Sequence, residues 1–539
     1  MGLREMFGGG DRHPMHDAEA AAQLIALIPA DNQLRALGDI TQWLSSVGEA
    51  PDFKPRVRLE VIGLLDDAGR KPERAVMLRY LKDPRLRNPS GRLAWRALYD
   101  FWSALADGYQ RCALEELPEF VVGEAGRESL AGLAARALRA RVAQIRTAML
   151  HYEPVPAAVW QSLYTLQARC ERAGLVSAPT HAYPAERLHT SPLLELMKGL
   201  LVAIAAPERL PPEEVDAAFR IAQRFAGAGR LEEAPFEGAT HVLRLDRGAP
   251  PARLAAPAQP GAQIRFLGAG EAVAKLEHMI GHQESAMLDE DERIAQEYSP
   301  GQKVTVLRQF MSYWGTTPPH PEKNLIRLEG GLAVVHGFPA VCHYVPHVVT
   351  QDTDPKAHGK PAAQRLGVVE EEAIVTPESW PERDAGLNVV HALAGPAVGA
   401  WAEVGDLAAI RIHDRNDWWL AAIRRLGAGA GGALEAEFEV LSRKPFGVWL
   451  RVLGHKDRMA ANWETTDSFA YDYIQAVVLT DRAAAGRAPQ LVVPKGKCVP
   501  GQILELLHGE RSRYLHFTEF LEQGKDYDRC AIEWQASAR

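Results

Sequence analysis

The spacing of apolar residues changes along the chain, from a helical period to a β period. Between residues 33 and 47, a helical stripe places the apolar side chains on one face: Leu34, Leu37, Ile40, Trp43 and Leu44. Beyond residue 314, apolar residues gather in short β-rich runs separated by turns that carry Gly, Asp or Asn. The change predicts a multidomain α+β protein. We expect an irregular all-helical N-terminal half, then a C-terminal antiparallel β-barrel and a small β segment.

These patterns divide the 539 residues into five segments. We predict a flexible N-terminus (1–15), a helical domain (16–231), a mixed α/β junction (232–314), a β-barrel (315–468) and a small C-terminal β module (469–539). Within the helical domain, Pro72 follows a stripe that ends near Leu65. Because proline suits the first turn of a helix, we expect a new helix to begin there. A divergent helical solenoid is the alternative to an irregular array.

Composition excludes several classes of protein. The chain is 47% hydrophobic and 24% charged, which is typical of a folded soluble protein and not of a fibre or a disordered chain. Its five cysteines contain no C-x-x-C pair, which argues against a disulfide framework and favours the reducing cytoplasm. We expect no signal peptide and no transmembrane segment. The longest apolar run, 199–206, is far shorter than the roughly 20 residues that a membrane helix needs.

One stretch differs in sign from the net charge of −8. Between Lys54 and Leu98 stand twelve Lys or Arg and five Asp or Glu. The stretch lacks the aromatic and glycine pattern of a nucleic-acid platform, so we expect no nucleic-acid partner. It is either a solvated helix face, with basic stems covering apolar surface, or a docking surface for anionic lipid or an acidic partner.

No motif of a catalytic or metal site stands out. The chain lacks G-x-S-x-G, a Walker loop and a dinucleotide fingerprint after a strand. His278 and His282 stand four residues apart on a predicted helix, but the acid of H-E-x-x-H is missing. We expect no catalytic residues, no metal and no cofactor.

One block of the β region carries a family resemblance. Val404-Gly-Asp-Leu407 precedes Trp418-Trp-Leu-Ala-Ala-Ile-Arg-Arg425, and a glycine-rich turn leads to Glu437-Phe-Glu-Val-Leu-Ser442. The block resembles the core strands of PilZ-like barrels, which are bacterial modules that bind cyclic di-GMP. A long helical region ahead of such a barrel resembles large PilZ-related proteins of proteobacteria. The resemblance covers about residues 320–455 and implies a regulatory protein that binds a nucleotide and has no enzymatic activity.

PilZ-like barrels hold their ligand with two motifs, R-x-x-x-R and [D/N]-x-S-x-x-G. Here Lys323-Asn-Leu-Ile-Arg327 stands at the first, with lysine for one arginine, and Asp384-Ala-Gly386 at the second, shorter and without serine. The resemblance implies that Lys323 and Arg327 bind phosphate or guanine, that Asp384 binds a guanine edge, and that Gly386 lets the backbone approach. Arg424 is a further candidate ligand residue, since only one residue of the Arg424-Arg425 pair can face a ligand from a strand.

Three hypotheses follow. The first is a cyclic di-GMP receptor that signals to a protein partner through its helical domain. The second is a scaffold whose PilZ-like barrel has lost the ligand and binds only protein, which the altered motifs favour. The third is an enzyme whose site lies in the helical half or in the junction.

Overall fold

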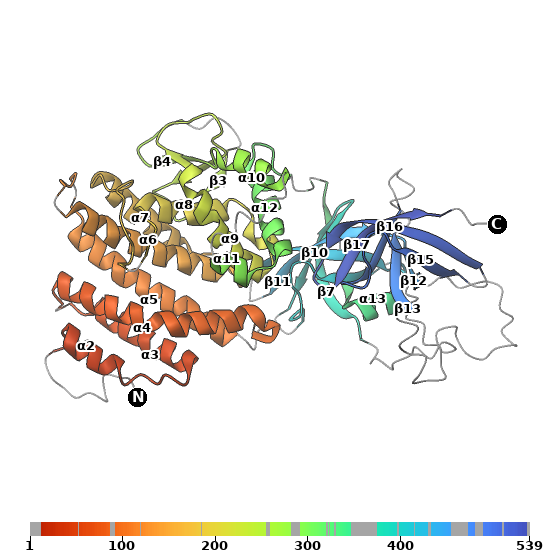
Figure 1. The fold of residues 1–539 in the computed structure, drawn as a ribbon, viewed down its shortest axis with the longest axis horizontal. Helices are drawn as coiled ribbons and strands as arrows, with labels where there is room; N and C mark the ends of the chain where they lie inside the picture. The colour runs from red at the N-terminus through yellow and green to blue at the C-terminus, as the bar shows by residue number, and fades with distance from the viewer. Residues whose placement is uncertain are drawn as a thin grey trace. The chain divides into compact units, whose positions relative to one another are not determined.

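The computed structural model divides the chain into two compact units, Met1–His320 and Pro321–Arg539 (Figure 1). The described residues are 12–51, 53–86, 92–118, 120–124, 126–184, 186–254, 259–281, 292–319, 322, 324–327, 330–346, 375–395, 398–413, 415–429, 433–453, 473–479, 489–508 and 511–535. Lys323, His282 and most of the expected flexible N-terminus lie outside them. Among the described helices, none is both long enough and apolar enough to cross a membrane.

The first unit begins with a stack of α-helices. They are α2 (Ala18–Ile25), α3 (Gln33–Glu49), α4 (Pro55–Lys82), α5 (Arg92–Glu116), α6 (Arg127–Met149), α7 (Ala157–Arg172), α8 (Pro192–Ala203) and α9 (Pro212–Phe225), with short 3-10 turns between some of them. Figure 1 shows α3, α4, α5 and α6 side by side. Asp17, Asn32 and Ser191 cap their helices by accepting an N–H of the first turn. The predicted helical N-terminal half is confirmed.

Helix α4 differs from the prediction that a new helix begins at Pro72. It runs without a break from Pro55 to Lys82 and contains Pro72 in its interior. Proline lacks the N–H that would bond to the residue four positions earlier, which disfavours a helix interior. The buried face continues on both sides of Pro72, from Leu65 through Gly69 to Val76. Packing of this face outweighs the local cost of the proline.

Residues 232–314, which we predicted as a mixed α/β junction, share the hydrophobic core of the helices. A four-stranded sheet has the order β1-β4-β2-β3, with β1 (Arg230–Glu232), β2 (His241–Arg244), β3 (Ala252–Arg253) and β4 (Ile264–Gly268). Three helices follow: α10 (Ala272–Gly281), α11 (Glu292–Glu297) and α12 (Pro300–Trp314). The buried Trp314 donates its indole N–H to the carbonyl of Leu201 at 2.9 Å. This contact fixes the end of α12 to α8.

The second unit contains two sets of antiparallel strands. The first set has the order β5-β7-β6-β9-β10-β11-β8, and β7 also pairs with β8. Six of its strands therefore form a ring, and β5 adds to the outside of β7. The strands are β5 (Ile326–Arg327), β6 (Gly331–His336), β7 (Glu378–Ala385), β8 (Val389–Ala394), β9 (Leu407–Ile412), β10 (Trp419–Ala428) and β11 (Leu434–Ser442). The block that resembles PilZ-like barrels supplies β10 and β11.

The second set is a closed barrel of order β12-β13-β14-β17-β16-β15. Its strands are β12 (Pro445–Leu453), β13 (Tyr473–Leu479), β14 (Gln490–Pro494), β15 (Ile503–His508), β16 (Arg511–Gln523) and β17 (Tyr527–Trp534). The antiparallel β-barrel in the C-terminal half is thus confirmed, but the boundary that we expected between residues 468 and 469 falls inside it. Strand β12 pairs with β13 and β15, so residues 445–453 belong with the C-terminal strands.

The two sets share a hydrophobic core. Leu407, Trp418 and Leu420 of the first set belong to the same buried cluster as Val477 and Val492 of the barrel. Helix α13 (Phe338–Tyr344), which follows β6, completes this cluster. Strands β9 and β10 therefore carry buried apolar side chains on both faces, which agrees with their near-continuous apolar sequences.

Candidate functional site

Two of the predicted ligand residues lie next to each other at the edge of the ring. Arg327 on β5 is the register partner of Asp384 on β7. Register partners on antiparallel strands have Cβ atoms about 5 Å apart, so the guanidinium and the carboxylate share one small surface. Both residues of β5 are exposed, which leaves Arg327 open to a ligand. The structure thus brings together two residues that are 57 positions apart in the chain.

Asp384 also belongs to a short row of charged side chains. Its Oδ1 lies 2.5 Å from Nδ1 of His391, and Nε2 of His391 lies 3.6 Å from Oε2 of Glu437. Hydrogen bonding to Glu437, and then to Asp384, raises the pKa of His391 against the opposing effect of burial. The two carboxylates thereby favour the imidazolium form. This row fixes the Asp384 carboxylate beside Arg327.

Gly386 lies in a turn where the backbone is tightly held. The carboxylate of Glu322 accepts the N–H groups of Leu387 at 2.6 Å and Asn388 at 3.1 Å. A Cβ at position 386 would lie 2.6 Å from the carboxyl carbon of Glu322, which is closer than carbon atoms approach without a shift. Glycine is needed here for the contact with Glu322. The expected role for Gly386, close approach of the backbone to a ligand, stays a prediction.

Sequence reasoning missed Arg443 and Arg415. Arg443 donates to the carbonyls of Gly386 at 3.2 Å and Leu387 at 2.7 Å, and its guanidinium carbon lies 4.5 Å from the ring centroid of Trp419. The guanidinium of Arg415 lies 5.4 Å from the same ring. Arg415 stands shortly before the Trp418-Trp419 pair and Arg443 follows it by 24 residues, and neither is part of a motif. The pairing of β10 with β11 brings Arg443 to the indole of Trp419, which Arg415 reaches from four residues earlier in the chain.

Arg424 lies elsewhere, between the ring and the barrel. Its guanidinium bonds to Glu439 at 2.7 Å and to both oxygens of Glu522 at 2.5 and 2.8 Å. Tyr527 and Arg529 also bond to Glu522, at 2.6 and 3.0 Å. Burial disfavours the charge of Arg424, but the charges around it, including both glutamates, raise its pKa. Its donors are directed to protein carboxylates, which makes Arg424 a link between β10 and β16.

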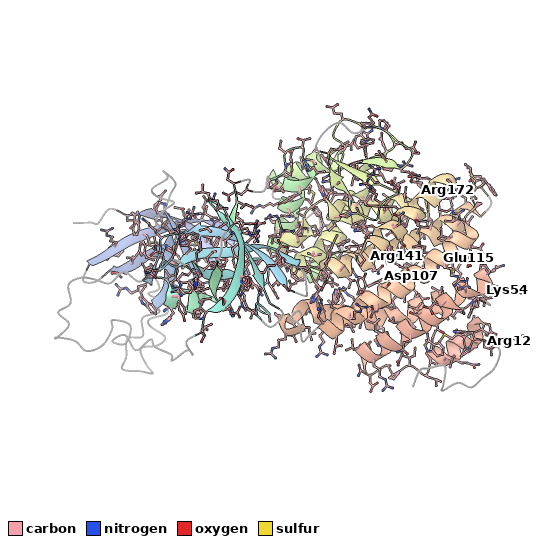
Figure 2. The ribbon with its side chains drawn as sticks, turned by 180° about the vertical axis from the view of Figure 1, so that it is seen from behind. Arg12, Lys54, Asp107, Glu115, Arg141 and Arg172 are labelled. Atoms are coloured by element: carbon pink, nitrogen blue, oxygen red, sulfur yellow. The ribbon has the colours of Figure 1, made fainter. Side chains whose placement is uncertain are left out.

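Some residues of the basic stretch in the helical unit pair with acids, and others are exposed. Arg58 is buried and bonds to Glu115 and to the carbonyl of Ala50, so it is part of the core. Other basic residues pair with acids on neighbouring turns or helices: Arg70, Arg74, Arg92 and Arg96. Lys54 and several others are exposed, as the sticks of Figure 2 show for Lys54. The stretch is therefore less basic in space than in sequence.

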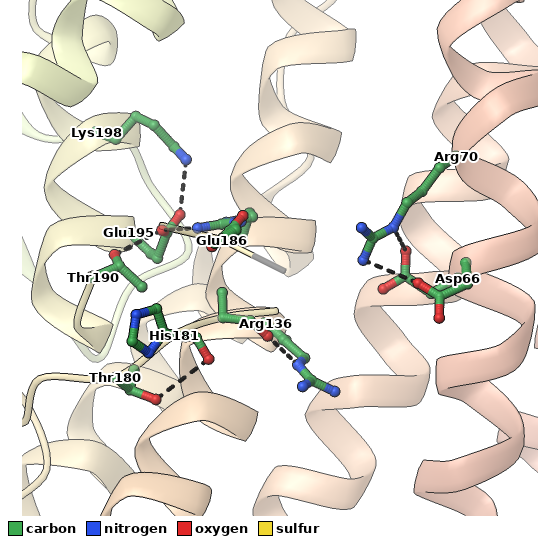
Figure 3. A network of polar contacts seen from close by, with 12 residues as sticks. Asp66, Arg70, Arg136, Thr180, His181, Glu186, Thr190, Glu195 and Lys198 are labelled. Carbon is green, nitrogen blue, oxygen red and sulfur yellow. Dashed lines mark hydrogen bonds and ion pairs between the residues drawn. The ribbon is translucent and has the colours of Figure 1, made fainter. Parts of the chain in front are cut away.

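A polar cluster fixes the loop between α7 and α8 (Figure 3). The guanidinium groups of Arg70, Arg136 and Arg139 lie 3.9, 5.3 and 5.4 Å from the ring centroid of Tyr183. The buried Glu195 bonds to Arg139 at 2.7 Å and to Lys198 at 2.8 Å. Burial would raise the pKa of Glu195, but the charges of Lys198 and Arg139 lower it to about 2. Each buried charge has a partner here, which indicates a structural role.

The ring edge offers the chemistry that an anionic purine nucleotide requires. Arg327, Arg415 and Arg443 can donate paired hydrogen bonds to phosphate and can stack on a purine. The carboxylate of Asp384 can accept from the N–H groups of a guanine edge. Across the described residues, no three His, Cys, Asp or Glu side chains gather as metal ligands.

Comparison with known protein families gives a match on the helical half. Residues 19–235 match the family described as "Cyclic-di-GMP receptor FimW, N-terminal domain". The matched residues run from α2 to β1 and make up less than half of the chain. No match is found among curated proteins or among solved structures. The helical half of this chain is therefore similar to the N-terminal domain of a cyclic di-GMP receptor.

Proposed function

We propose that this chain is a non-enzymatic receptor for cyclic di-GMP, of PilZ-like type, that signals to a protein partner through its helical unit. The observation that carries the proposal is the match of residues 19–235 to the N-terminal domain of a cyclic di-GMP receptor. The strand block at 404–442 supports the same ligand from the other unit, since it resembles PilZ-like barrels, which bind this nucleotide.

The ring edge is the proposed ligand site. Lys323 and Arg327 bind phosphate, and Asp384 accepts from the guanine edge. Arg415 and Arg443, whose guanidinium groups lie over the buried Trp419 ring, donate to the second phosphate. The proximity of Arg327 to Asp384, and of Arg443 to the turn at Gly386, supports one continuous surface. The surface holds both cationic and acceptor groups, and a ligand with two phosphates and two guanines needs both.

The proposed receptor acts in the cytoplasm. All five cysteines are buried free thiols, and burial raises the pKa of Cys112 to about 12. Such thiols stay protonated and unreactive, which suits a reducing compartment and a structural role. The signal passes to the partner at the exposed surface of the helical unit, including the basic residues between Lys54 and Arg96.

Isothermal titration of the full chain with cyclic di-GMP tests the proposal. A dissociation constant near 1 μM corresponds to a binding free energy of about −8 kcal/mol, and binding of this strength gives a clear signal in the titration. We expect Arg327→Ala and Arg443→Ala each to weaken binding at least tenfold. Arg513→Ala, which removes an exposed arginine from the barrel, is the matched control and should bind normally. Absence of heat at millimolar ligand would refute the receptor function.

The second candidate is a scaffold in which the ring binds protein and no nucleotide. The contact of Glu322 with the turn at Gly386 favours it, because a protein carboxylate stands beside the position where the ligand motif of PilZ-like barrels has its glycine. Normal folding without any response to cyclic di-GMP would support this function over the first.

A further inference from the structure

A cavity of about 180 Å³ lies between the ring and the barrel, apart from the proposed nucleotide site. Its lining residues come from both: His336, Gly337, Trp401, Asp406, Lys525 and Asp526. The last two belong to the turn between β16 and β17. A ligand in this cavity would therefore touch both parts of the second unit.

One wall of the cavity is aromatic and rigid. The rings of His336 and Trp401 stack with centroids 4.1 Å apart and an angle of 13° between their planes. The indole N–H of Trp401 donates to Oε2 of Glu378 at 3.0 Å, and Trp380 and the backbone of Gly399 donate to the same oxygen. Three donors on one carboxylate oxygen hold the wall in place before any ligand arrives.

The other wall is acidic. Asp406, only 9% exposed, lies 3.5 Å from Nζ of Lys525 and accepts the backbone N–H of Glu403 at 2.8 Å. Lys525 also bonds to Glu403 at 2.5 Å, so one ammonium serves two carboxylates. Asp526, the third carboxylate, accepts the N–H of Leu407 at 3.4 Å. Two carboxylates, Asp406 and Asp526, and one ammonium, Lys525, line this wall, so it carries a net negative charge when both aspartates are ionised.

The combination selects one chemical group. A planar cation can lie along an aromatic wall and, at its edge, donate two parallel hydrogen bonds to a carboxylate. A guanidinium has this shape and five donors, whereas an ammonium has no flat face and is more strongly hydrated. A phosphate would be repelled by Asp406 and Asp526 in their ionised forms. We propose that the cavity binds the guanidinium of an arginine side chain that a partner protein supplies, with Asp406 as its principal acceptor.

The role of a partner arginine rests on the proposed receptor function, but the geometry of the cavity does not depend on nucleotide binding. An arginine inserted between ring and barrel would strengthen their contact. The partner would thus respond to the arrangement of the two parts of the second unit.

Protonation of Asp406 gives the site a recognisable pH dependence. Burial raises the pKa of Asp406 to about 7, while Lys525 opposes the shift and Glu403 and Asp526 add to it. Burial also lowers the pKa of His336, so this ring stays neutral above pH 6.5 and does not repel a cation. Only the ionised Asp406 accepts from both N–H groups. With a pKa of about 7, the ionised fraction of Asp406 rises about tenfold between pH 6 and pH 8, and arginine affinity should rise with it.

Saturation-transfer NMR of the full chain with the peptide acetyl-Gly-Arg-Gly-amide tests the proposal. Two peptides serve as ligand controls. In one, citrulline replaces arginine and keeps the planar shape without the charge. In the other, lysine replaces arginine and keeps the charge without the planar group. We expect the arginine peptide to bind at least tenfold more tightly than either, and its affinity to increase between pH 6 and pH 8. Asp406→Asn should abolish both the preference and the pH dependence.

Asp417→Asn is the matched control, because it removes an exposed carboxylate of the same unit and should leave binding unchanged. Should Asp406→Asn fail to fold, the citrulline comparison and the pH series on the unaltered chain still decide. Equal binding of the arginine and citrulline peptides would overturn the proposal, as would an affinity that does not change with pH. Competition with cyclic di-GMP separates the two functions. Displacement of the peptide by the nucleotide would assign the cavity to the nucleotide and overturn the arginine site, while loss of nucleotide binding alone would refute only the receptor function.

Discussion

Breaking the contact between Arg424 and Glu522 should lower the stability of the interface between the ring and the barrel. The guanidinium bonds to both oxygens of Glu522, whose side chain is 17% exposed. Burial alone would raise the pKa of Glu522. Hydrogen bonding to Arg424 and the charge of Arg424 outweigh burial and lower the pKa from an ordinary 4.5 to about 2. A shift of this size corresponds to about 3 kcal/mol of stability at neutral pH.

We expect Arg424→Met to cost about 3 to 5 kcal/mol, because it leaves a buried carboxylate without its main partner. The double variant Arg424→Met with Glu522→Gln should cost less than the sum of the two single variants, because each single variant already removes the interaction between Arg424 and the Glu522 carboxylate. Because the folded pKa of Glu522 is depressed, its contribution is complete above pH 4.5 and is lost as the pH falls toward 2. In Arg424→Met this acid-dependent part should largely disappear.

Native-state hydrogen exchange of the amides in β10, β16 and β17 measures the change, because it reports the free energy of opening segment by segment in a chain with more than one unit. Arg513→Met on β16 is the control and should change the opening free energy by less than about 0.5 kcal/mol. A loss below about 1 kcal/mol in Arg424→Met, with an unaltered acid dependence, would refute the assignment of Arg424 as the link. Intact stability with weakened cyclic di-GMP binding would instead return Arg424 to the ligand residues that we predicted.

Three smaller predictions concern other parts of the chain. Pro72→Ala should stabilise the helical unit by about 1 kcal/mol in thermal unfolding. The substitution removes about 3 kcal/mol of helix cost and loses only about 1.6 kcal/mol with two buried methylenes. A lower unfolding midpoint would show that the proline is needed for packing. His391→Gln should remove a stabilisation that is present below the unfolded pKa of about 6.5 and is lost as the pH rises through the raised folded pKa, and denaturation at pH 6 and pH 9 checks this sign. Gly386→Ala should push Glu322 from the turn and lower its stability by about 1 kcal/mol. Hydrogen exchange of the Leu387 and Asn388 amides measures this loss, and unchanged protection would show that the turn holds without Glu322.

The candidate site could be predicted only in part. Arg327 and Asp384 were found by comparison with motif patterns, and their register pairing on β5 and β7 puts them on one surface. Arg443 could not be found this way, because it reaches Trp419 through the pairing of β10 with β11, and Arg415, although close to Trp419 in the chain, belongs to no motif. Arg424 shows the converse, since nothing in its own strand indicates that Glu522, 98 residues later, accepts from it.

The sequence by itself determined the classes of structure and the place where they change. Helical stripes and capping residues such as Asn32 and Ser191 act within one or two turns, so they can be read locally. Tertiary structure decided how these pieces combine. Packing carries α4 through Pro72, the pairing of β7 with β8 closes the ring, and the pairing of β12 with β13 and β15 assigns residues 445–453 to the barrel. Each of these outcomes depends on contacts between residues far apart in the chain, and the free energy of such contacts is not contained in any local pattern.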